Sequence, residues 1–378
     1  MRKPILFVNV TRQCNVDCPR CYLSKEVRSQ KDLIPFEYIE KALNDPFYNG
    51  PDIEPVLAWE GGELTLVGEH ILRDYMNRVR EKFPNVRQTM VTNALNVPNW
   101  VIELCKEFMD GHFEVTYASG HKYTLDGSSE KYQDKFKRSI KKAKDAGLSV
   151  AVNVELNIET YNDGPAALVQ VMRETGVKIW EFDVSVRFDD FLADPQYNHC
   201  DYPVLPGTMT FDMFSQYIID LVKNHDHDLQ ELGIQSSILW HSQTLNEAQF
   251  FDVKNSNEMF SLNPDGTVFL NVLWSDMKEM FLGNIQTKEI SDFLRHPVRR
   301  KHIRWEVMER AKSCTTCEYY SSCNGGPSHA PLYDGVSSEC SGGKMIYDFM
   351  RKEYKGVYDS NQHMIDPIQG DIVNFSKD

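Results

Sequence analysis

Three cysteines near the start of the chain have the type and spacing to hold an iron–sulfur cluster. They occur as Cys14-Asn-Val-Asp-Cys18-Pro-Arg-Cys21, directly after the apolar run Ile5–Val10. Thiols this close in sequence would close only short, strained disulfide loops. As thiolates they can instead bind three irons of a four-iron cluster, for which cysteine is the usual ligand. The fourth iron would then be open to a substrate or a cofactor.

A structural zinc site is the alternative for these three thiols. Zinc in such sites has four protein ligands, so a fourth Cys or His would have to lie nearby. After Cys21 the next such residue in the sequence is His70. We therefore favour the iron–sulfur interpretation.

A Cys-x3-Cys-x2-Cys loop after a first strand resembles the signature of the radical SAM superfamily. The resemblance implies a 4Fe–4S cluster whose open iron chelates the amine and carboxylate of S-adenosylmethionine (SAM). One electron then cleaves SAM to a 5′-deoxyadenosyl radical, so an electron donor such as a flavodoxin or a ferredoxin is implied too. The motif departs from the family at one position. The aromatic residue usual before the third cysteine is replaced by Arg20, and Tyr22 follows Cys21 instead.

A second motif, Glu60-Gly61-Gly62-Glu63, ends the predicted second strand. It resembles the GGE motif of the same family. The resemblance implies that Gly61 and Gly62 let the backbone approach SAM closely, and that Glu63 pairs with the SAM ammonium. A Gly-Gly-Glu turn alone is a weak signal, but about 40 residues after a cysteine triad and at a strand end it is specific.

Short β-rich runs alternate with amphipathic helical runs from residue 5 to about 186, which is the pattern of repeated βα units. Strands are predicted at 5–10, 55–59, 87–91, 112–117, 148–156 and 178–186, and helices at 35–43, 69–83, 99–109, 130–146 and 165–174. The expected fold is α/β, a partial (βα)6 TIM-like barrel, which radical SAM proteins share. Chemistry in such barrels lies at the C-terminal ends of the strands, where the cysteine loop falls.

Polar residues also follow or line the later strands. Thr92-Asn93 and Ser119 come after the third and fourth strands, where the family often has polar contacts to SAM or substrate; capping of the strand ends is the alternative. Polar residues alternate with apolar ones along the fifth and sixth strands: Asn153, Glu155 and Asn157, then Glu181, Asp183 and Ser185. A period of two puts each set on one face, which should be the barrel lumen. Buried carboxylates are costly unless they bind or pair. We expect ligand contact there, with Ser119 and Asn153 among the SAM contacts; pairing with a cation such as Arg187 is the alternative.

Length and composition restrict the function classes. The 378 residues suit a large domain, expected at 1–230, and a smaller one at 231–378. A net charge of −14 argues against a nucleic-acid partner. The N-terminus shows no signal-peptide pattern and no apolar run approaches the ~20 residues that span a bilayer. We therefore expect a cytoplasmic protein without a membrane partner, in which a count of nine cysteines indicates metal sites rather than disulfides.

A second set of cysteines lies in the smaller domain. Cys314, Cys317, Cys323 and the distant Cys340 suit either a zinc site or an iron–sulfur cluster, and their spacing alone does not decide between them. The region resembles the SPASM extension of radical SAM enzymes, in which Asp265-Gly266 and 282–285 have counterparts. The resemblance implies an auxiliary 4Fe–4S cluster on these four cysteines. A second auxiliary cluster would lack its ligands, because Asn271 and Pro327 occupy cysteine positions of the full SPASM pattern.

The substrate is suggested only by resemblance. A single auxiliary cluster with Cys323-Asn-Gly325-Gly326 resembles peptide-cyclising maturases of ribosomally made precursors. That implies a peptide substrate. Because no leader-binding domain fits before Ile5, it also implies either a separate leader-binding protein or a leader that docks elsewhere. Oxidation or epimerisation of a small molecule, such as a sugar or an aminocyclitol, is the competing enzymatic function. A non-catalytic metal-binding scaffold is the alternative from another class. Cys105 is expected to be a buried structural thiol, and the role of Cys200 is left open.

Overall fold

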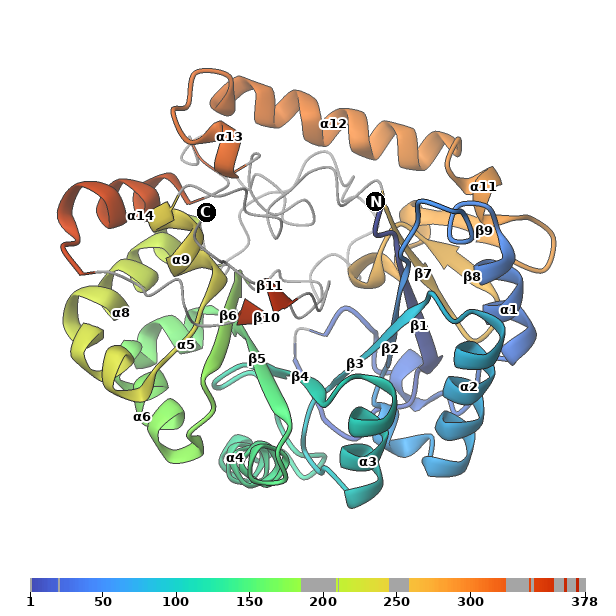
Figure 1. Cartoon of the computed structure of the whole chain (residues 1–378), viewed down its shortest axis with the longest axis horizontal. Helices are drawn as coiled ribbons and strands as arrows, with labels where there is room; N and C mark the ends of the chain where they lie inside the picture. The colour runs from blue at the N-terminus through green and yellow to red at the C-terminus, as the bar shows by residue number, and fades with distance from the viewer. Residues whose placement is uncertain are drawn as a thin grey trace.

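Six parallel strands, each adjacent to the next in the chain, form the body of the protein (Figure 1). They are β1 (Ile5–Thr11), β2 (Val56–Gly61), β3 (Arg87–Thr92), β4 (His112–Tyr117), β5 (Ser149–Leu156) and β6 (Ile179–Val184). The computed structural model describes residues 2–19, 21–184, 209, 211–244, 258–323, 340, 343–356, 364–365 and 372–373. The α/β fold with an open, TIM-like arrangement of βα units is confirmed, with strand limits within two residues of those predicted.

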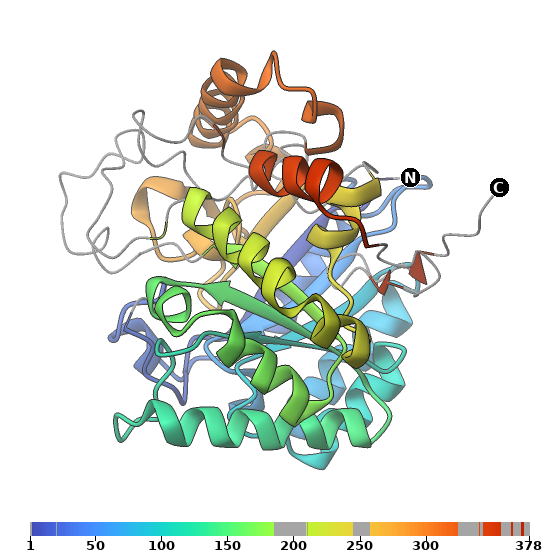
Figure 2. The same cartoon turned by 90° about the vertical axis from the view of Figure 1, so that its left-hand side faces the viewer.

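Helices cover the outer face of these strands. The predicted ones are α1 (Phe36–Asn44), α2 (Glu69–Lys82), α3 (Asn99–Phe108), α4 (Ser129–Asp145) and α6 (Pro165–Thr175). Three more were not predicted: α5 (Ile158–Asp163), α8 (Phe211–Leu232) and α9 (Ser237–Thr244). Figure 2 shows α4, α6 and α8 side by side along the sheet. No helix within the described ranges is both long and apolar enough to cross a bilayer.

Alternate residues of each strand face opposite sides of the sheet, as a period of two requires. In β5 the outward side chains Val150, Val152, Val154 and Leu156 belong to the main hydrophobic core under the helices. The inward residues Ser149, Asn153 and Glu155 are only partly buried. Parallel pairing puts Asn153 beside Glu181, and Glu155 beside Asp183. Four of the polar residues expected in the lumen, Asn153, Glu155, Glu181 and Asp183, therefore face it.

The C-terminal region adds three strands to the same sheet. β7 (Met259–Leu262) pairs in parallel with β1, and β8 (Thr267–Phe269) and β9 (Phe281–Asn284) follow in antiparallel order. A hairpin turn at 263–266 joins β7 to β8, and Gly266 has the positive φ of 81° that such a turn needs. The predicted domain boundary at residue 230 stays a prediction, since α8 extends to Leu232 and β7 shares the sheet of the barrel.

Helices then connect the two ends of the sheet. The chain continues through α11 (Ile290–Phe293) and α12 (Pro297–Cys314), which contacts β9. Next come α13 (Tyr320–Cys323) and α14 (Lys344–Asp348), and α14 contacts α8 and α9 beyond β6. Figure 1 shows α12 along the top of the view, from the β7–β9 side to the α8 side. A short antiparallel pair, β10 (Met364–Ile365) and β11 (Ile372–Val373), lies near the C-terminus.

Candidate active site

The first cysteine loop begins where β1 ends and is fixed on both sides. The backbone N–H of Cys14 donates to the carbonyl of Arg28 at 3.1 Å, and that of Asp17 donates to the carbonyl of Tyr123 at 2.8 Å. The Arg28 guanidinium, itself buried, donates to the carbonyl of Val16 at 3.3 Å and pairs with the Asp17 carboxylate at 3.3 Å. The loop is therefore preorganised by its own neighbours.

Burial dominates the acidity of the three thiols. It raises the pKa of Cys14 to about 11 and raises the pKa values of Cys18 and Cys21 as well. The Arg28 guanidinium opposes the shift for Cys14 and Cys21, and the Lys122 ammonium opposes it for Cys18 and Cys21. Metal binding requires thiolates, so a bound metal must displace these protons. The sequence analysis missed Arg28 and Lys122, because both are remote from any motif.

The two glycines of the GGE motif lie against the cysteine loop. A Cβ on Gly61 would come within 2.2 Å of the Thr11 carbonyl oxygen, and one on Gly62 within 2.3 Å of the Gln13 carbonyl oxygen. The N–H of Gly62 donates to the Thr11 carbonyl at 2.8 Å. The absence of side chains is thus required for the end of β2 to touch the cysteine loop. The predicted approach of these glycines to SAM stays a prediction.

Glu63 is a buried carboxylate held by hydrogen bonds. Its side chain is 2% exposed. It accepts from the N–H of Thr65 at 2.9 Å, the hydroxyl of Thr92 at 2.7 Å and the N–H of Asn93 at 3.0 Å. No cationic side chain in the described part of the chain forms an ion pair with it. The three hydrogen bonds stabilise the carboxylate but leave its charge without a cationic partner among the described residues, so this site is suited to a cationic ligand group.

Asn93 joins the GGE motif to the cysteine loop. Its side-chain N–H donates to Asn15 at 2.9 Å and lies 3.9 Å from the Cys14 sulfur. Its backbone carbonyl accepts from the Tyr132 hydroxyl at 2.6 Å. The structure therefore brings the first cysteines, Glu63 and the end of β3 into one connected site at the C-terminal ends of the strands.

The other expected SAM contacts have protein partners. The Ser119 hydroxyl donates to Asp163 at 2.5 Å. The Asn153 side-chain N–H donates to Asp183 at 3.2 Å, while the Asn153 Oδ1 is buried with no hydrogen bond to the described residues. One expectation was wrong: Asn157 does not line the lumen. It lies beyond β5 and caps α5, accepting from the N–H of Thr160 at 2.7 Å.

Two lumen carboxylates have different environments. Glu155 lies close enough to the cysteine loop for its charge to raise the pKa values of Cys18 and Cys21. Glu181 instead accepts from the backbone N–H of Ser237 at 3.0 Å, at the start of α9. Protein hydrogen bonds at a helix start thus compensate Glu181.

The second cysteine set gathers around one aromatic ring. Cys314 ends α12, Cys317 follows in the turn and donates its N–H to the Cys314 carbonyl at 3.0 Å, and Cys323 ends α13. Burial raises the pKa of Tyr347, and the thiols of Cys323, Cys317 and Cys340 add to that shift. These three cysteines, distant in sequence, therefore lie near the same phenol.

Neither cysteine set is as tight as a single metal ion requires. Tetrahedral zinc with thiolates at about 2.3 Å would hold the sulfur atoms about 3.8 Å apart. Among the described residues, one set of three or more potential ligands has all its ligand atoms within 4.8 Å: His227, Asp228 and Glu231. In neither cysteine set do three sulfur atoms lie within 4.8 Å of one another. A four-iron cluster does not require such a grouping, because it spreads its cysteines over different irons.

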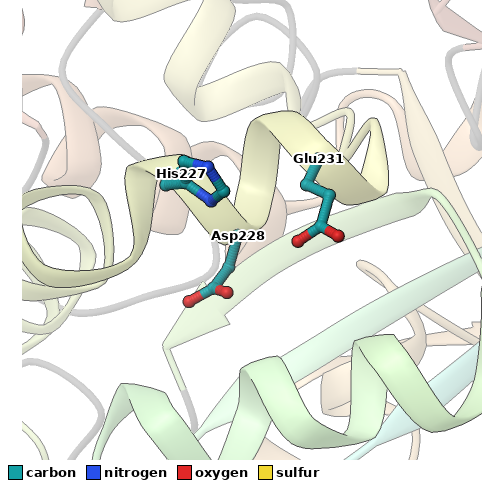
Figure 3. Close-up of side chains that lie close together, drawn as sticks. All are labelled: His227, Asp228 and Glu231. Atoms are coloured by element: carbon teal, nitrogen blue, oxygen red, sulfur yellow. The ribbon is translucent and has the colours of Figure 1, made fainter.

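That carboxylate-rich set lies on the outer surface of α8 (Figure 3). His227 and Glu231 are exposed, and the carboxylate of Asp228 pairs with Arg173 at 2.7 Å and with the His225 ring at 3.1 Å. Glu231 lies 3.6 Å from the same guanidinium. The set therefore belongs to a solvated, ion-paired helix surface rather than to a buried metal site.

Cys105 is fully buried, with its sulfur 3.5 Å from the Met90 sulfur, which confirms a structural thiol.

Several positions singled out from the sequence lie outside the described residues: Arg20, Ser185, Arg187, Cys200, Gly325, Gly326 and Pro327. Asn271 is described. It is 8% exposed and precedes a short 3-10 turn at Val272–Trp274.

Comparisons with known proteins agree with this geometry. No protein-family model matches the chain. The Fe-coproporphyrin III synthase of Methanosarcina barkeri, a radical SAM enzyme, is 22% identical over 86% of this chain and 83% of its own length.

Solved structures resemble the chain over most of its length. The structure of anSMEcpe with bound AdoMet matches at a TM-score of 0.68 and 15% identity, covering 92% of this chain and 95% of its own. Streptococcus suis SuiB bound to its precursor peptide SuiA matches at 0.53 and 13%, covering 90% and 76%. The chain therefore has the fold of the radical SAM enzymes that its cysteine motif resembles.

Proposed function

We propose that the chain is a radical SAM enzyme. Cys14, Cys18 and Cys21 would hold the catalytic 4Fe–4S cluster, and Glu63 would bind the ammonium of SAM. When bound, these groups supply a 5′-deoxyadenosyl radical that abstracts hydrogen from the substrate. The observation that carries the proposal is the buried Glu63 carboxylate. It is oriented by three donors, linked through Asn93 to the Cys14 loop, and forms no ion pair with a cation of the described residues.

Residues of the chain would orient SAM beside the cluster. Hydrogen bonds from Thr65, Thr92 and Asn93 fix the orientation of Glu63, so little ordering is needed when the ammonium binds. The unpaired Asn153 Oδ1 offers an acceptor to a hydroxyl of the ligand. The expected SAM contact of Ser119 would require its hydroxyl to turn from Asp163 or to act together with it.

The second cysteine set would hold an auxiliary cluster. Cys317, Cys323 and Cys340 lie around Tyr347, and Cys314 ends the preceding helix. A cluster at this place would receive or relay an electron, or tie α12 to α14. An external donor, such as a flavodoxin or a ferredoxin, would supply the electron for SAM cleavage.

A peptide is the proposed substrate, which the enzyme would cross-link or otherwise modify. The support is the similarity in fold to anSMEcpe, which is also known with bound AdoMet and the Cp18Cys peptide, and to SuiB with its precursor peptide SuiA. A small-molecule substrate is the second candidate. It is favoured by the sequence similarity to an Fe-coproporphyrin III synthase.

The test is reductive cleavage of SAM by the anaerobically reconstituted protein. We expect about eight iron and eight sulfide per chain, from two four-iron clusters. Cys14→Ala should abolish 5′-deoxyadenosine formation, whereas Cys340→Ala should retain cleavage but lose product and about four iron. Cys105→Ala is the matched control, because this buried thiol belongs to neither set. If Cys14→Ala cleaves SAM normally, the catalytic assignment fails; four iron with one zinc would instead refute the auxiliary cluster.

The substrate class is tested by deuterium transfer. A candidate peptide or tetrapyrrole carrying deuterium at the reacting carbon should label 5′-deoxyadenosine. Transfer from the peptide supports maturation, and transfer from the tetrapyrrole supports the second candidate.

A further inference from the structure

Two neighbouring acceptors in the lumen have no hydrogen-bond donor within the part of the chain that the structure describes. Glu60 lies one residue before Gly61, at the C-terminal end of β2, and pairs in register with Asn9 of β1. Residues paired in this way lie side by side on the same face of the sheet. Asn9 is fully buried, and Glu60 is partly buried. Both therefore face the lumen directly beneath the cysteine loop.

The hydrogen bonds around Asn9 determine which of its atoms is left over. The Asn263 side-chain N–H donates to the carbonyl of Ser275 at 2.9 Å, so the Asn263 oxygen must face Asn9. The Asn9 side-chain N–H therefore donates to Asn263 at 2.8 Å, and also to the Ser261 hydroxyl at 3.0 Å. Its Oδ1 remains buried with no hydrogen bond to any described residue.

The Glu60 carboxylate is likewise uncompensated. It forms no hydrogen bond or ion pair with the described residues. Two cations of the site have other partners: Arg12 donates to the Ser275 carbonyl at 2.7 Å and pairs with Asp276 at 3.4 Å, and Lys122 donates to the Thr116 carbonyl at 2.8 Å. Burial raises the pKa of Glu60 to about 8. An adjacent cation is what would lower it again.

We propose that Glu60 and Asn9 form a subsite for a cationic nitrogen group of the substrate, an ammonium or a guanidinium. Such a group supplies several N–H donors and a positive charge, which matches a carboxylate beside an amide oxygen. Because Glu60 adjoins the GGE motif and the cysteine loop, a substrate held there would be anchored beside the reacting centre. The inference rests on the proposed function, because only an enzyme has a substrate to bind at this subsite. It narrows the candidate substrates to molecules that carry an amine or a guanidine.

The test uses the reconstituted full chain with saturating SAM and ligand-observed saturation-transfer NMR. The probes are n-butylammonium, n-butylguanidinium, n-butanol and butyrate, which are similar in size. Both cations should bind, and Glu60→Gln should weaken them about tenfold or more, as loss of a charge-assisted hydrogen bond does. Asn9→Ala should weaken them about threefold. The ratio of the two cation affinities distinguishes an amine from a guanidine as the natural group.

Glu114→Gln is the matched control, since Glu114 also faces the lumen but has a partner. If Glu114→Gln weakens cation binding as much as Glu60→Gln does, the cations respond only to the negative charge of the lumen, and the proposed subsite is wrong. Equal binding of n-butanol or butyrate, or loss of cation binding when SAM is added, would overturn it too. Circular dichroism and SAM cleavage on the same samples show that each variant is folded. SAM cleavage without cation binding refutes the subsite alone; cation binding without any SAM cleavage refutes the proposed function alone.

Discussion

The contact between the GGE motif and the cysteine loop can be tested with one methyl group. In Gly62→Ala the new Cβ would lie 2.3 Å from the Gln13 carbonyl oxygen and 2.4 Å from that of Arg12. Both neighbours are backbone, so no side chain can turn away. The loop must move by at least about 0.7 Å to reach the 3.0 Å that real contacts respect. Overpacking of this kind costs about 1–3 kcal/mol of the free energy of unfolding.

The displacement should also disturb the cluster, because Cys14 follows Gln13 directly. We expect Gly62→Ala to lower the free energy of unfolding, measured by urea denaturation, and to retain less iron per chain after anaerobic reconstitution. Gly68→Ala is the control. Gly68 has a φ of 91° and open space around it, so an alanine there strains the backbone by about 1–2 kcal/mol without touching the loop. It should lose stability but keep its iron. A Gly62→Ala protein with normal stability and full iron would refute the steric argument.

Two further predictions concern the lumen and its mouth. Burial lowers the pKa of His112 to about 4, below its unfolded value of 6.5, so the stability that it contributes is present above pH 6.5 and is lost as the pH falls toward 4. Linkage predicts that the free energy of unfolding falls by about 3 kcal/mol over this pH range because of His112, and that the His112→Phe variant does not show this fall. If the free energy of unfolding depends on pH in the same way in the wild type and the variant, the prediction is wrong. Asn271 occupies a ligand position of the auxiliary cluster that this chain is expected to lack, so we expect the space beside it to border the substrate cavity. Asn271→Trp should then raise the KM for the substrate and leave uncoupled SAM cleavage largely intact, and unchanged substrate kinetics would contradict this placement.

The periodic part of the fold was predictable from the sequence. Runs rich in β-branched residues alternate with amphipathic helical runs in the sequence, and this alternation predicted β1 to β6. It could do so because strands and helices each have a characteristic spacing of buried residues. α5 was missed because six residues carry too little periodicity, and Asn157 was therefore assigned to a strand when it caps this helix. α8 was missed although it is 22 residues long. It lies after the βα repeats, so the alternation of strands and helices that located the other elements no longer applied.

The candidate site was predictable only where spacing in sequence encodes chemistry. The Cys-x3-Cys-x2-Cys loop and Glu63 were found because a ligand set and a turn have fixed spacing. Arg28 and Lys122 were not found, since their proximity to the thiols depends on how separate loops meet. The missing donors at Glu60 and Asn9 were equally invisible, because an unpaired atom is defined by everything around it rather than by its own residue type.

The pairing of β7 with β1 has a consequence for how the protein is made. Ile5 and Met259 are neighbours in the sheet, yet 254 residues separate them along the chain. At the usual synthesis rate of about 5–20 residues per second, β1 emerges from the ribosome roughly 13–50 s before β7. During that time the strand that precedes the first cysteines has one unpaired edge, which is a template for wrong pairing. The nascent chain therefore has a period of vulnerability, in which a chaperone on that edge or early delivery of iron would most affect the yield of active protein.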